Sequence, residues 1–491
     1  MRILYKPYLE LIKSAENAAE SILDGMIIGT SGFTKSGDSK AVLPSFARSK
    51  STAKITLFSG ASLGRAIDGE LALNKKINRR IPFQSNTDLR SAINSHEVMY
   101  VDQHLAETAD QLQSKQLPKI DIAIIEASMI TEDGMIVPTS SVGNNVVFAQ
   151  LADKIIIEVN SAFPIEMNGI HDCYLAQPFP NRAPIPITKT TDRIGTPFIS
   201  IDPSKVIAIV ETNEADEPAD TSTGDEKTLG IAKHFLQFLN AEVEKNKLSK
   251  TLQPLQAGIG KIANAVLHEI GGSDFHDLTM YSEVLQDSTL DLIDTGKLKF
   301  ASGSAYTFSK AYQERFYANF NHYKTKLILR PQHVSNAAEV IHRLGVIALN
   351  TAIEVDIYGN VNSTHLCGTK IMNGIGGSDE FARNSNICIF VCPSTSKNNT
   401  ISHIVPMVSH VDHTEHDVDI IITEQGLADL RGLAPIERAQ LIIENCLHPD
   451  YKKQMLDYFE RAKLKGGQTP HLLTEAFNWH IHLEEKGTMQ L

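Results

Sequence analysis

Cysteine is scarce in this 491-residue chain, with five residues in all, and the absence of paired spacing limits what they can do. They are Cys173, Cys367, Cys388, Cys392 and Cys446. Their number is odd and no pair has zinc-type spacing, so we expect free, buried thiols in a reducing cytosol and no metal site. Cys388 and Cys392 would share one strand face but lie roughly 13 Å apart there, too far to form a disulfide.

Long apolar runs and an excess of positive charge are also missing. No apolar stretch approaches the ~20 residues of a membrane span, and the N-terminal residues lack a signal-peptide core. We therefore expect a cytoplasmic protein with no membrane partner. The net charge of −12 argues against a nucleic-acid partner, whose phosphates require a basic surface. An anionic small molecule remains compatible, provided that local cations and backbone N–H groups bind it.

What the chain does contain is typical of a globular α/β protein, with 42% apolar and 21% charged residues. Near-continuous apolar stretches predict strands buried on both faces, as in parallel sheets covered by helices. The predicted strands are 26–33, 54–58, 121–125, 154–159, 206–210, 255–260, 278–283, 352–358, 387–392 and 418–423, and the predicted helices are 8–24, 231–242, 261–269 and most of the last 50 residues.

An acidic stretch, 211–227, interrupts this alternation and contains almost no apolar residue. We predict a surface linker there. The expected organisation is two open α/β domains with mostly parallel sheets, covering residues 1–215 and 228–491, joined by a linker at 216–227.

Glu283 is the most informative acidic residue. It follows the alternating stretch 278–281 and precedes Asp287-Ser288-Thr289, which has the composition of a helix cap. Glu283 should therefore lie at the carboxyl end of a strand, which is the ligand side of open α/β sheets. A carboxylate before a turn is more often simply solvated, so this position alone does not define a site.

Glycine-rich stretches follow several predicted strands. Gly258-Ile259-Gly260-Lys261-Ile262-Ala263 fits G-x-G-x-x-A, in which glycines let a backbone approach a ligand and a helix N-terminus attracts negative charge. With Glu283 about 20 residues further on, the stretch is compatible with a nicotinamide dinucleotide site. A tight turn without a ligand is the simpler alternative. A second loop, Asn373 to Ser378, could supply N–H donors to an oxyanion, and Lys397 follows the strand 387–392, where it could meet a phosphate.

Two other patterns suggest chemistry less strongly. Gly60-Ala61-Ser62-Leu63-Gly64 fits the nucleophile elbow G-x-S-x-G, although a glycine loop that forms a turn or binds phosphate is the stronger interpretation. Four histidines, His403, His410, His413 and His416, lie close together in the sequence, but none of their spacings matches a known ligand motif. We predict a polar loop there and no metal.

Taken together, several stretches resemble one family in the same order along nearly the whole chain. They are Ser31-Gly32-Phe33-Thr34, residues 138–145, Gly258-Ile259-Gly260, residues 282–287, residues 356–363 and residues 423–432. The family is the acetyl-CoA hydrolase / succinyl-CoA:acetate CoA-transferase family of class I CoA-transferases. The chain departs from its pattern at Gly37-Asp38-Ser39-Lys40, where the family more often has an aromatic residue and a proline before the lysine.

The resemblance implies that Glu283 is a nucleophile that forms an acyl-glutamyl anhydride and then a glutamyl-CoA thioester. An ionised carboxylate, with an ordinary pKa near ~4.3, would need no general base. The resemblance also assigns oxyanion-hole N–H groups to Ile259 and Gly377 and polar active-site positions to Asn336 and Glu424. Further residues match positions that contact CoA, namely Gly258, Ile259, Gly260, Lys261, Ile262, Ile353, Asn373, Gly377 and Lys397.

The expected activity is ping-pong transfer of CoA between small carboxylates such as acetate, propionate and succinate. Coenzyme A would be a substrate, with no tightly bound cofactor and no metal, and the active site would lie at the cleft between the domains of a homodimeric enzyme. Two alternatives remain: acetyl-CoA hydrolysis by the same residues, and a CoA- or nucleotide-binding module without chemistry. We favour transfer, because a covalent glutamyl-CoA has little purpose if water is the acceptor.

Overall fold

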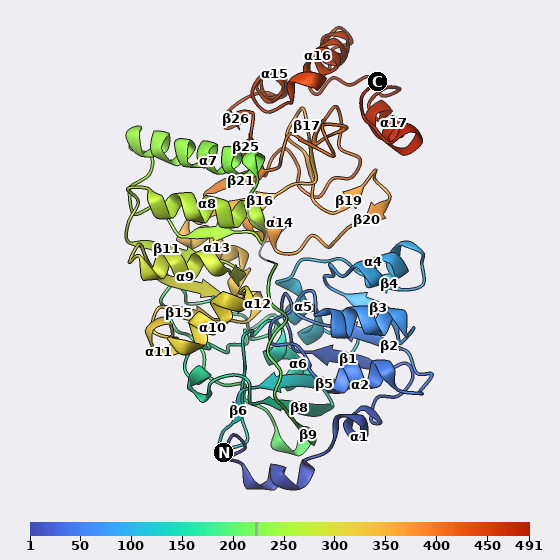
Figure 1. Ribbon diagram of the computed structural model, residues 1–491, viewed down its shortest axis with the longest axis vertical. Coiled ribbons are helices and arrows are strands. Elements are labelled where there is room, and N and C mark those ends of the chain that lie inside the picture. Colours follow the sequence, from blue (N-terminus) through green and yellow to red (C-terminus); the bar gives the residue numbers. More distant parts are fainter. Residues whose placement is uncertain (221–223) are drawn as a thin grey trace. The chain divides into compact units, whose positions relative to one another are not determined.

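Residues 1–220 and 224–491 are described by the computed structural model of the chain, which divides into two compact units (Figure 1). The first unit comprises Met1–Thr221 and Thr279–Leu344, and the second comprises Ser222–Leu278 and Gly345–Leu491. This division differs from the contiguous domains expected from the sequence, because residues 279–344 pack with the N-terminal part of the chain. Residues 221–223 of the predicted linker lie outside the described residues.

The first unit is built on a sheet whose seven strands are all parallel. Their order is β4 (Met99–Tyr100), β3 (Ile77–Ile81), β2 (Ile55–Phe58), β1 (Ile27–Thr30), β5 (Ile122–Ala127), β8 (Lys154–Asn160) and β9 (Val206–Thr212). The strand order reverses between β1 and β5, and such switch points are where open α/β sheets bind ligands. The prediction of a mostly parallel α/β fold is confirmed.

Helices cover both faces of this sheet, as the continuous apolar strands require. They are α1 (Ala15–Ala19), α2 (Val42–Arg48), α3 (Glu70–Leu73), α4 (Thr87–Asn94), α5 (Glu107–Gln113) and α6 (Asn145–Leu151). Ile28 of β1 packs in the core with α1 to α3, whereas the neighbouring Gly29 faces the Phe148 ring of α6. The predicted helix 8–24 is wrong in extent. A 3-10 helix, η1 (Lys6–Leu11), comes first, and Ser14 caps a separate α1 by accepting a hydrogen bond from the Asn17 backbone N–H.

The later part of the first unit contains β11, β13 and β15 as neighbouring strands, together with a short pair, β12 and β14. Its elements are β11 (Leu278–Tyr281), β12 (Val284–Leu285), α9 (Asp287–Asp294), β13 (Leu298–Gly303), β14 (Ala305–Tyr306), α10 (Lys310–Ala318), α11 (Phe320–Tyr323), β15 (Leu327–Leu329), α12 (Gln332–Ser335) and α13 (Ala338–Leu344). The predicted strand and helix on either side of Glu283 are therefore confirmed.

In the second unit, β10 (Leu255–Ala257), β16 (Ile347–Thr351), β21 (Ile387–Val391), β25 (Ile420–Thr423) and β26 (Gly426–Asp429) lie in this order. The first four are parallel and β26 is antiparallel. The sequence prediction missed β16 and placed a strand at 352–358, where only β17 (Glu354–Asp356) forms. Short strands complete the unit: β18 (Val361–Asn362), β19 (His365–Leu366), β20 (Lys370–Ile371), β22 (Thr395–Ser396), β23 (Ile401–Ser402) and β24 (Ile404–Val405).

The helices of the second unit are α7 (Glu226–Glu244), α8 (Lys261–Gly272), α14 (Ser378–Asn384), α15 (Pro435–Asn445), α16 (Pro449–Lys463) and α17 (Asn478–Lys486). Figure 1 shows α7 and α8 as neighbouring helices, and these two pack against each other. The last three confirm the predicted helical C-terminal region, and they share an apolar core with β21 and β25. Among the described residues, no helix is long and apolar enough to cross a membrane.

Candidate active site

Glu283 lies in the short turn between β11 and β12, where the backbone is held on both sides. Its carbonyl oxygen accepts hydrogen bonds from the backbone N–H groups of Ser304 (2.6 Å) and Ala305 (3.1 Å). Val284 then pairs with Ala305 in the parallel β12–β14 pair. The backbone of the candidate nucleophile is therefore fixed by β14, so the position of its side chain depends on β14 being correctly placed.

The Glu283 carboxylate has one direct side-chain partner that the structure identifies, Asn336, at the end of α12. The Asn336 Nδ2 group donates to Glu283 Oε1 at 2.8 Å. Asn336 itself is fully buried, and its other amide atom, Oδ1, has no hydrogen-bond partner within 1–220 and 224–491. Buried polar atoms without a partner are uncommon and often mark functional sites.

Burial raises the pKa of Glu283 to about 7, and the hydrogen bond from Asn336 counteracts only part of this rise. The side chain keeps part of its surface accessible, but burial of the carboxyl group disfavours the ionised form. The expectation of an ordinary carboxylate pKa is therefore wrong, because Glu283 is not a solvated surface residue.

An apolar cluster includes Val284, the residue next to Glu283. Val284 and Ala305 form a buried cluster with Phe33, Ala61 and Leu105. Phe33 and Ala61 come from the loops that follow β1 and β2. Segments far apart in the sequence thus meet next to the carboxylate, at the carboxyl edge of the first unit's sheet.

The second unit contains the predicted glycine turn Gly258-Ile259-Gly260 between β10 and α8, as the motif indicated. Gly260 has a φ of +115°, which favours glycine, and the Gly258 N–H donates to the Leu349 carbonyl at 3.0 Å. The Ile259 side chain is 54% exposed although it is apolar. Lys261 forms an ion pair with Asp225 at 2.9 Å, and Ile262 is buried.

The loop Asn373 to Gly377 leads into α14, with Gly377 at the N-cap position. Asn373 Nδ2 donates to the carbonyls of Ser363 (3.2 Å) and Gly374 (2.8 Å), which shapes the loop from within. Because α14 leads into β21 and packs on it, its N-terminus lies toward the carboxyl edge of the sheet.

Glu424 and Lys397 occupy the ends of β25 and of the hairpin β22–β23. Glu424 accepts hydrogen bonds from the Ser394 N–H (2.7 Å) and Oγ (2.5 Å). Burial disfavours its ionised form, but these hydrogen bonds from Ser394 outweigh burial, so the pKa of Glu424 is lowered. Lys397 is exposed, and it begins a run of three non-glycine residues with positive φ at 397–399. Lys227 supports the hairpin by donating to the Thr395 carbonyl at 2.7 Å.

The structure thus places the predicted site residues in two groups. Glu283 and Asn336 are in direct contact in the first unit. In the second unit, the segment 258–262, Ile353 and Glu424 follow parallel strands at their carboxyl ends, and the α14 helix, with Gly377 at its N-cap position, has its N-terminus toward the same edge. Lys397 lies in the turn of the antiparallel hairpin β22–β23. Ile353 is anchored there, since its carbonyl oxygen contacts His403 Nδ1 at 2.5 Å.

The other sequence patterns have structural explanations. Ser62 is 4% exposed, which does not suit the exposed nucleophile of an elbow. The four histidines separate: His403 contacts Ile353, His410 stacks on His365, His413 contacts Ser378, and His416 lies on the surface. All five cysteines are free, as expected, and four are buried.

Comparison with known proteins identifies the family. Residues 1–211 match the model of the acetyl-CoA hydrolase/transferase N-terminal domain, and residues 313–459 match that of the C-terminal domain. The chain is 47% identical to a succinyl-CoA:acetate CoA-transferase of Clostridium kluyveri, over 98% of this chain and 90% of the relative. It is 43% identical to an acetyl-CoA hydrolase of Schizosaccharomyces pombe, over 98% of each chain.

Solved structures agree in fold. RipA from Yersinia pestis superposes with a TM-score of 0.72 at 20% identity, covering 93% of this chain and 98% of that one. A 4-hydroxybutyrate CoA-transferase from Porphyromonas gingivalis gives a TM-score of 0.65 at 20% identity, covering 93% and 99%. The protein is an enzyme with the fold of CoA-transferases. It belongs to the acetyl-CoA hydrolase/transferase family, as its sequence suggested.

Proposed function

We propose that this enzyme transfers CoA between small carboxylates through covalent intermediates on Glu283. The observation that carries the proposal is the buried Glu283 carboxylate, bonded to Asn336 on a turn fixed by β14. A carboxylate with few water molecules around it is a better nucleophile than a hydrated one. With a pKa of about 7, roughly half of the molecules carry the reactive form at neutral pH.

The first half-reaction converts the thioester of a donor acyl-CoA into a thioester on the enzyme. Glu283 attacks the acyl carbonyl, the C–S bond breaks, and CoA leaves as a thiolate from an acyl-glutamyl anhydride. The thiolate then attacks the Glu283 carboxyl carbon, the anhydride C–O bond breaks, and the donor acid leaves as a carboxylate. The enzyme now holds a glutamyl-CoA thioester.

The second half-reaction runs the same steps in reverse with another carboxylate. The acceptor attacks the Glu283 carboxyl carbon and expels the CoA thiolate, which forms a new mixed anhydride. The thiolate attacks the acceptor's acyl carbon, which releases the new acyl-CoA and restores the Glu283 carboxylate. Thioester energy is conserved, so the scheme requires neither ATP nor a metal, and CoA is a substrate.

Each attack creates an oxyanion, and we assign its stabilisation to the backbone N–H groups of Ile259 and Gly377. The open glycine turn at 258–260 and the helix N-cap at Gly377 support this assignment. Preorganised donors of this kind are worth about 3 to 4 kcal/mol. We assign CoA contacts to the segment 258–262 and, in addition, to Ile353, Asn373 and Lys397. Lys397, exposed on a hairpin that Lys227 supports, suits a phosphate group.

Hydrolysis of acetyl-CoA by the same residues is the second candidate, and the relatives named acetyl-CoA hydrolases, at 42 to 43% identity, favour it. In that case water would attack the anhydride or the glutamyl thioester. We place transfer first because the most similar relative quoted above, at 47% identity, is named a transferase.

Mass spectrometry of the intact protein tests the covalent step. After mixing with acetyl-CoA, the wild-type enzyme should gain the mass of a CoA adduct, because Glu283 retains CoA until an acceptor arrives. Glu283→Ala and Glu283→Gln should show no adduct and a loss of activity of at least about a hundredfold. Glu97→Gln, at a surface ion pair with Lys75, serves as the matched control and should behave as wild type. An adduct of equal yield in Glu283→Ala would exclude Glu283 as the acceptor.

We further propose, from the family resemblance, a cytoplasmic homodimer. Light scattering coupled to size-exclusion chromatography would measure its mass against the 54.0 kDa of one chain.

A further inference from the structure

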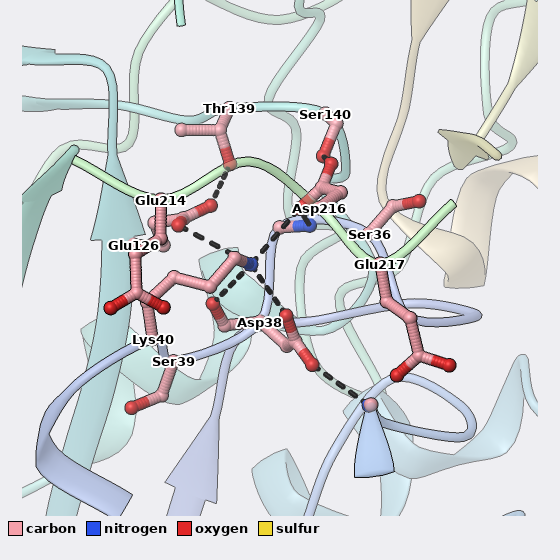
Figure 2. Close-up of polar contacts among 12 residues, drawn as sticks. Ser36, Asp38, Ser39, Lys40, Glu126, Thr139, Ser140, Glu214, Asp216 and Glu217 are labelled. Atoms are coloured by element: carbon pink, nitrogen blue, oxygen red, sulfur yellow. Dashed lines mark hydrogen bonds and ion pairs between the residues drawn. The ribbon is translucent and has the colours of Figure 1, made fainter. Parts of the chain in front are cut away.

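Lys40 places a buried ammonium group among three carboxylates at the carboxyl edge of the first unit's sheet (Figure 2). Its side chain is 8% exposed. Lys40 Nζ lies 2.5 Å from Asp38 Oδ1, 2.9 Å from Asp216 Oδ1 and 3.5 Å from Glu126 Oε1. We call these four residues the Lys40 cluster. It lies beside β1 and β5, where the strand order reverses, and no step of the proposed reaction uses it directly.

The carboxylates of the cluster tie together loops that are far apart in the sequence. Asp216 accepts hydrogen bonds from the Gly37 N–H (2.9 Å) and from the Ser140 hydroxyl. Asp38 accepts from the Gly64 N–H at 2.8 Å. The cluster therefore connects the loop after β1, the turn after β2, the segment 138–145 and the chain that follows β9.

Glu126 connects the cluster to the sheet itself. It belongs to β5, and its carboxylate accepts hydrogen bonds from Thr139 Oγ1 (2.5 Å) and Asn160 Nδ2 (2.7 Å). Thr139 precedes Ser140 in the chain, so two adjacent residues of one loop contact two different acidic members of the cluster.

The ammonium is what allows these carboxylates to be buried together. Burial alone lowers the pKa of Lys40, but Asp38, Glu126 and Asp216 outweigh it and raise this pKa well above its usual range. Lys40 is therefore charged, and it is neither a nucleophile nor an acyl acceptor. Removing one partner from such a buried network leaves charges uncompensated, which is far more costly than loss of a surface pair.

Two of the loops held by the cluster also form hydrogen bonds with β14 and the residue that follows it. From the loop after β1, Ser36 Oγ donates to the Tyr306 carbonyl at 2.7 Å, and Thr34 Oγ1 lies 2.8 Å from Thr307 Oγ1. From the segment 138–145, the Ser140 carbonyl accepts from the Tyr306 N–H at 3.2 Å. Ser36, four residues before Lys40, and Ser140, a hydrogen-bond partner of Asp216, thus both contact the strand that fixes the Glu283 backbone.

We propose that Lys40 and Asp216 are positioning residues for Glu283. They hold the loops that place β14, and β14 holds the Glu283 carbonyl through the N–H groups of Ser304 and Ala305. The inference rests on the proposed role of Glu283. It adds that this role depends on two charged residues that are far from Glu283 in the sequence. A shift of about 1 Å in a reacting group can slow a reaction about a hundredfold.

A second ion pair between the same two segments provides a matched control. Lys35 Nζ lies 2.5 Å from Glu217 Oε1, so this pair also joins the loop after β1 to the chain after β9. Its side chains are 34% and 39% exposed, whereas those of Lys40 and Asp216 are 8% and 4% exposed. Partly exposed pairs contribute little to stability.

The experiment compares Lys40→Met, Asp216→Asn, Lys35→Met and Glu217→Gln with wild type. Formation of the CoA adduct is timed after mixing with saturating acetyl-CoA, KM for acetyl-CoA is measured, and thermal unfolding confirms that each variant is folded. Lys40→Met and Asp216→Asn should slow adduct formation about tenfold or more while KM changes less than about threefold. Lys35→Met and Glu217→Gln should remain within about twofold.

Wild-type rates in folded Lys40→Met would overturn the inference, as would an equal loss in the Lys35 and Glu217 variants. A rise in KM with an unchanged adduct rate would also overturn it, because binding and not the nucleophile would then be affected. If Lys40→Met does not fold, Asp216→Asn decides, since it removes one charge without changing the size of the side chain. Absence of an adduct in the wild-type enzyme would instead contradict the proposed function.

Discussion

At the scale of single residues, the pKa of Glu283 is set by a balance between burial and one hydrogen bond. Burial raises its pKa to about 7, and Asn336 stabilises the charged form at 2.8 Å. Because attack requires the carboxylate, formation of the CoA adduct should increase as the pH rises through 7 and should be lost as the pH falls below it. At pH values above the pKa that Glu283 has in the unfolded chain, the same burial lowers the free energy of unfolding. Such a cost is typical of a residue that is retained for function.

Asn336→Ala tests this balance. Loss of a hydrogen bond to a charged group costs about 1.5 to 3 kcal/mol, which corresponds to roughly one to two pH units. The rate of adduct formation should therefore reach its midpoint at least about one unit higher than in wild type. The measurement is the initial rate of adduct formation from acetyl-CoA at a series of pH values.

The control for this profile is Asn74→Ala, which removes an exposed amide that donates to the Glu70 carbonyl of the preceding helix. Its midpoint should coincide with that of wild type. A midpoint in Asn336→Ala that stays in place or moves to lower pH would show that Asn336 does not stabilise the Glu283 carboxylate.

Single residues also show how far the sequence was informative. Glu283 and Asn336 could be singled out because their neighbours resemble a family motif, but their contact could not, since 53 residues separate them. The raised pKa of Glu283 was missed for the same reason. It arises from burial in the folded chain, where Phe33, Ala61 and Leu105 cluster with the neighbouring Val284.

At the scale of elements, strands β5 and β8 carry Glu126 and Glu158 within otherwise apolar stretches. Both are fully buried. A carboxylate inside a buried strand needs an internal partner. In the sequence, each of these two residues therefore indicates a polar contact within the core. Glu126 meets the Lys40 cluster, and Glu158 accepts from the Val42 N–H (2.8 Å) at the start of α2.

Burial raises the pKa of Glu126, against the opposing effect of Lys40, so the folded state keeps a proton on this carboxyl to a higher pH than an exposed glutamate would. The folded state thus holds a proton that the unfolded chain releases above about pH 4.5. Stability should decrease as the pH rises from there through the raised pKa of Glu126 and then level off. Glu126→Gln, which is permanently neutral, removes this dependence.

Glu126→Gln should therefore match the wild-type Tm near pH 5 and exceed it at pH 9 by about 2 °C or more. Calorimetry at the two pH values measures the difference. Glu97→Gln, exposed on the first unit, should show no such change between them. A Tm for Glu126→Gln below that of wild type at pH 9 would mean that the charged carboxylate stabilises the cluster.

Elements also explain the errors in the predicted fold. Residues 347–351 form β16, which lies between β10 and β21, whereas the sequence pattern predicts a strand at 352–358. The acidic stretch 211–227 was predicted to lie on the surface, which is wrong for Asp216, because that carboxylate is buried by Lys40, Gly37 and Ser140. In both cases tertiary partners decide the structure and local composition does not show them.

At the scale of the whole molecule, the division into two units does not follow the order of the sequence. Residues 279–344, which carry Glu283 and Asn336, interrupt the second unit in the sequence but pack with the first. This insertion could not be predicted from composition, because both halves repeat the same arrangement of strand, glycine loop and helix.

The choice between transfer and hydrolysis is a property of the complete enzyme, and the fate of the thioester decides it. If glutamyl-CoA is protected from water, acetyl-CoA alone should be consumed only to the extent of about one equivalent per active site, the amount of adduct formed. Adding succinate or propionate should then convert acetyl-CoA into the corresponding acyl-CoA while total thioester stays constant. Chromatography of the CoA esters measures both quantities, with Glu283→Ala as the inactive control. Steady loss of total thioester without an added carboxylate, at the rate seen with one, would instead identify a hydrolase, because water would then be resolving the glutamyl intermediate as fast as any acid.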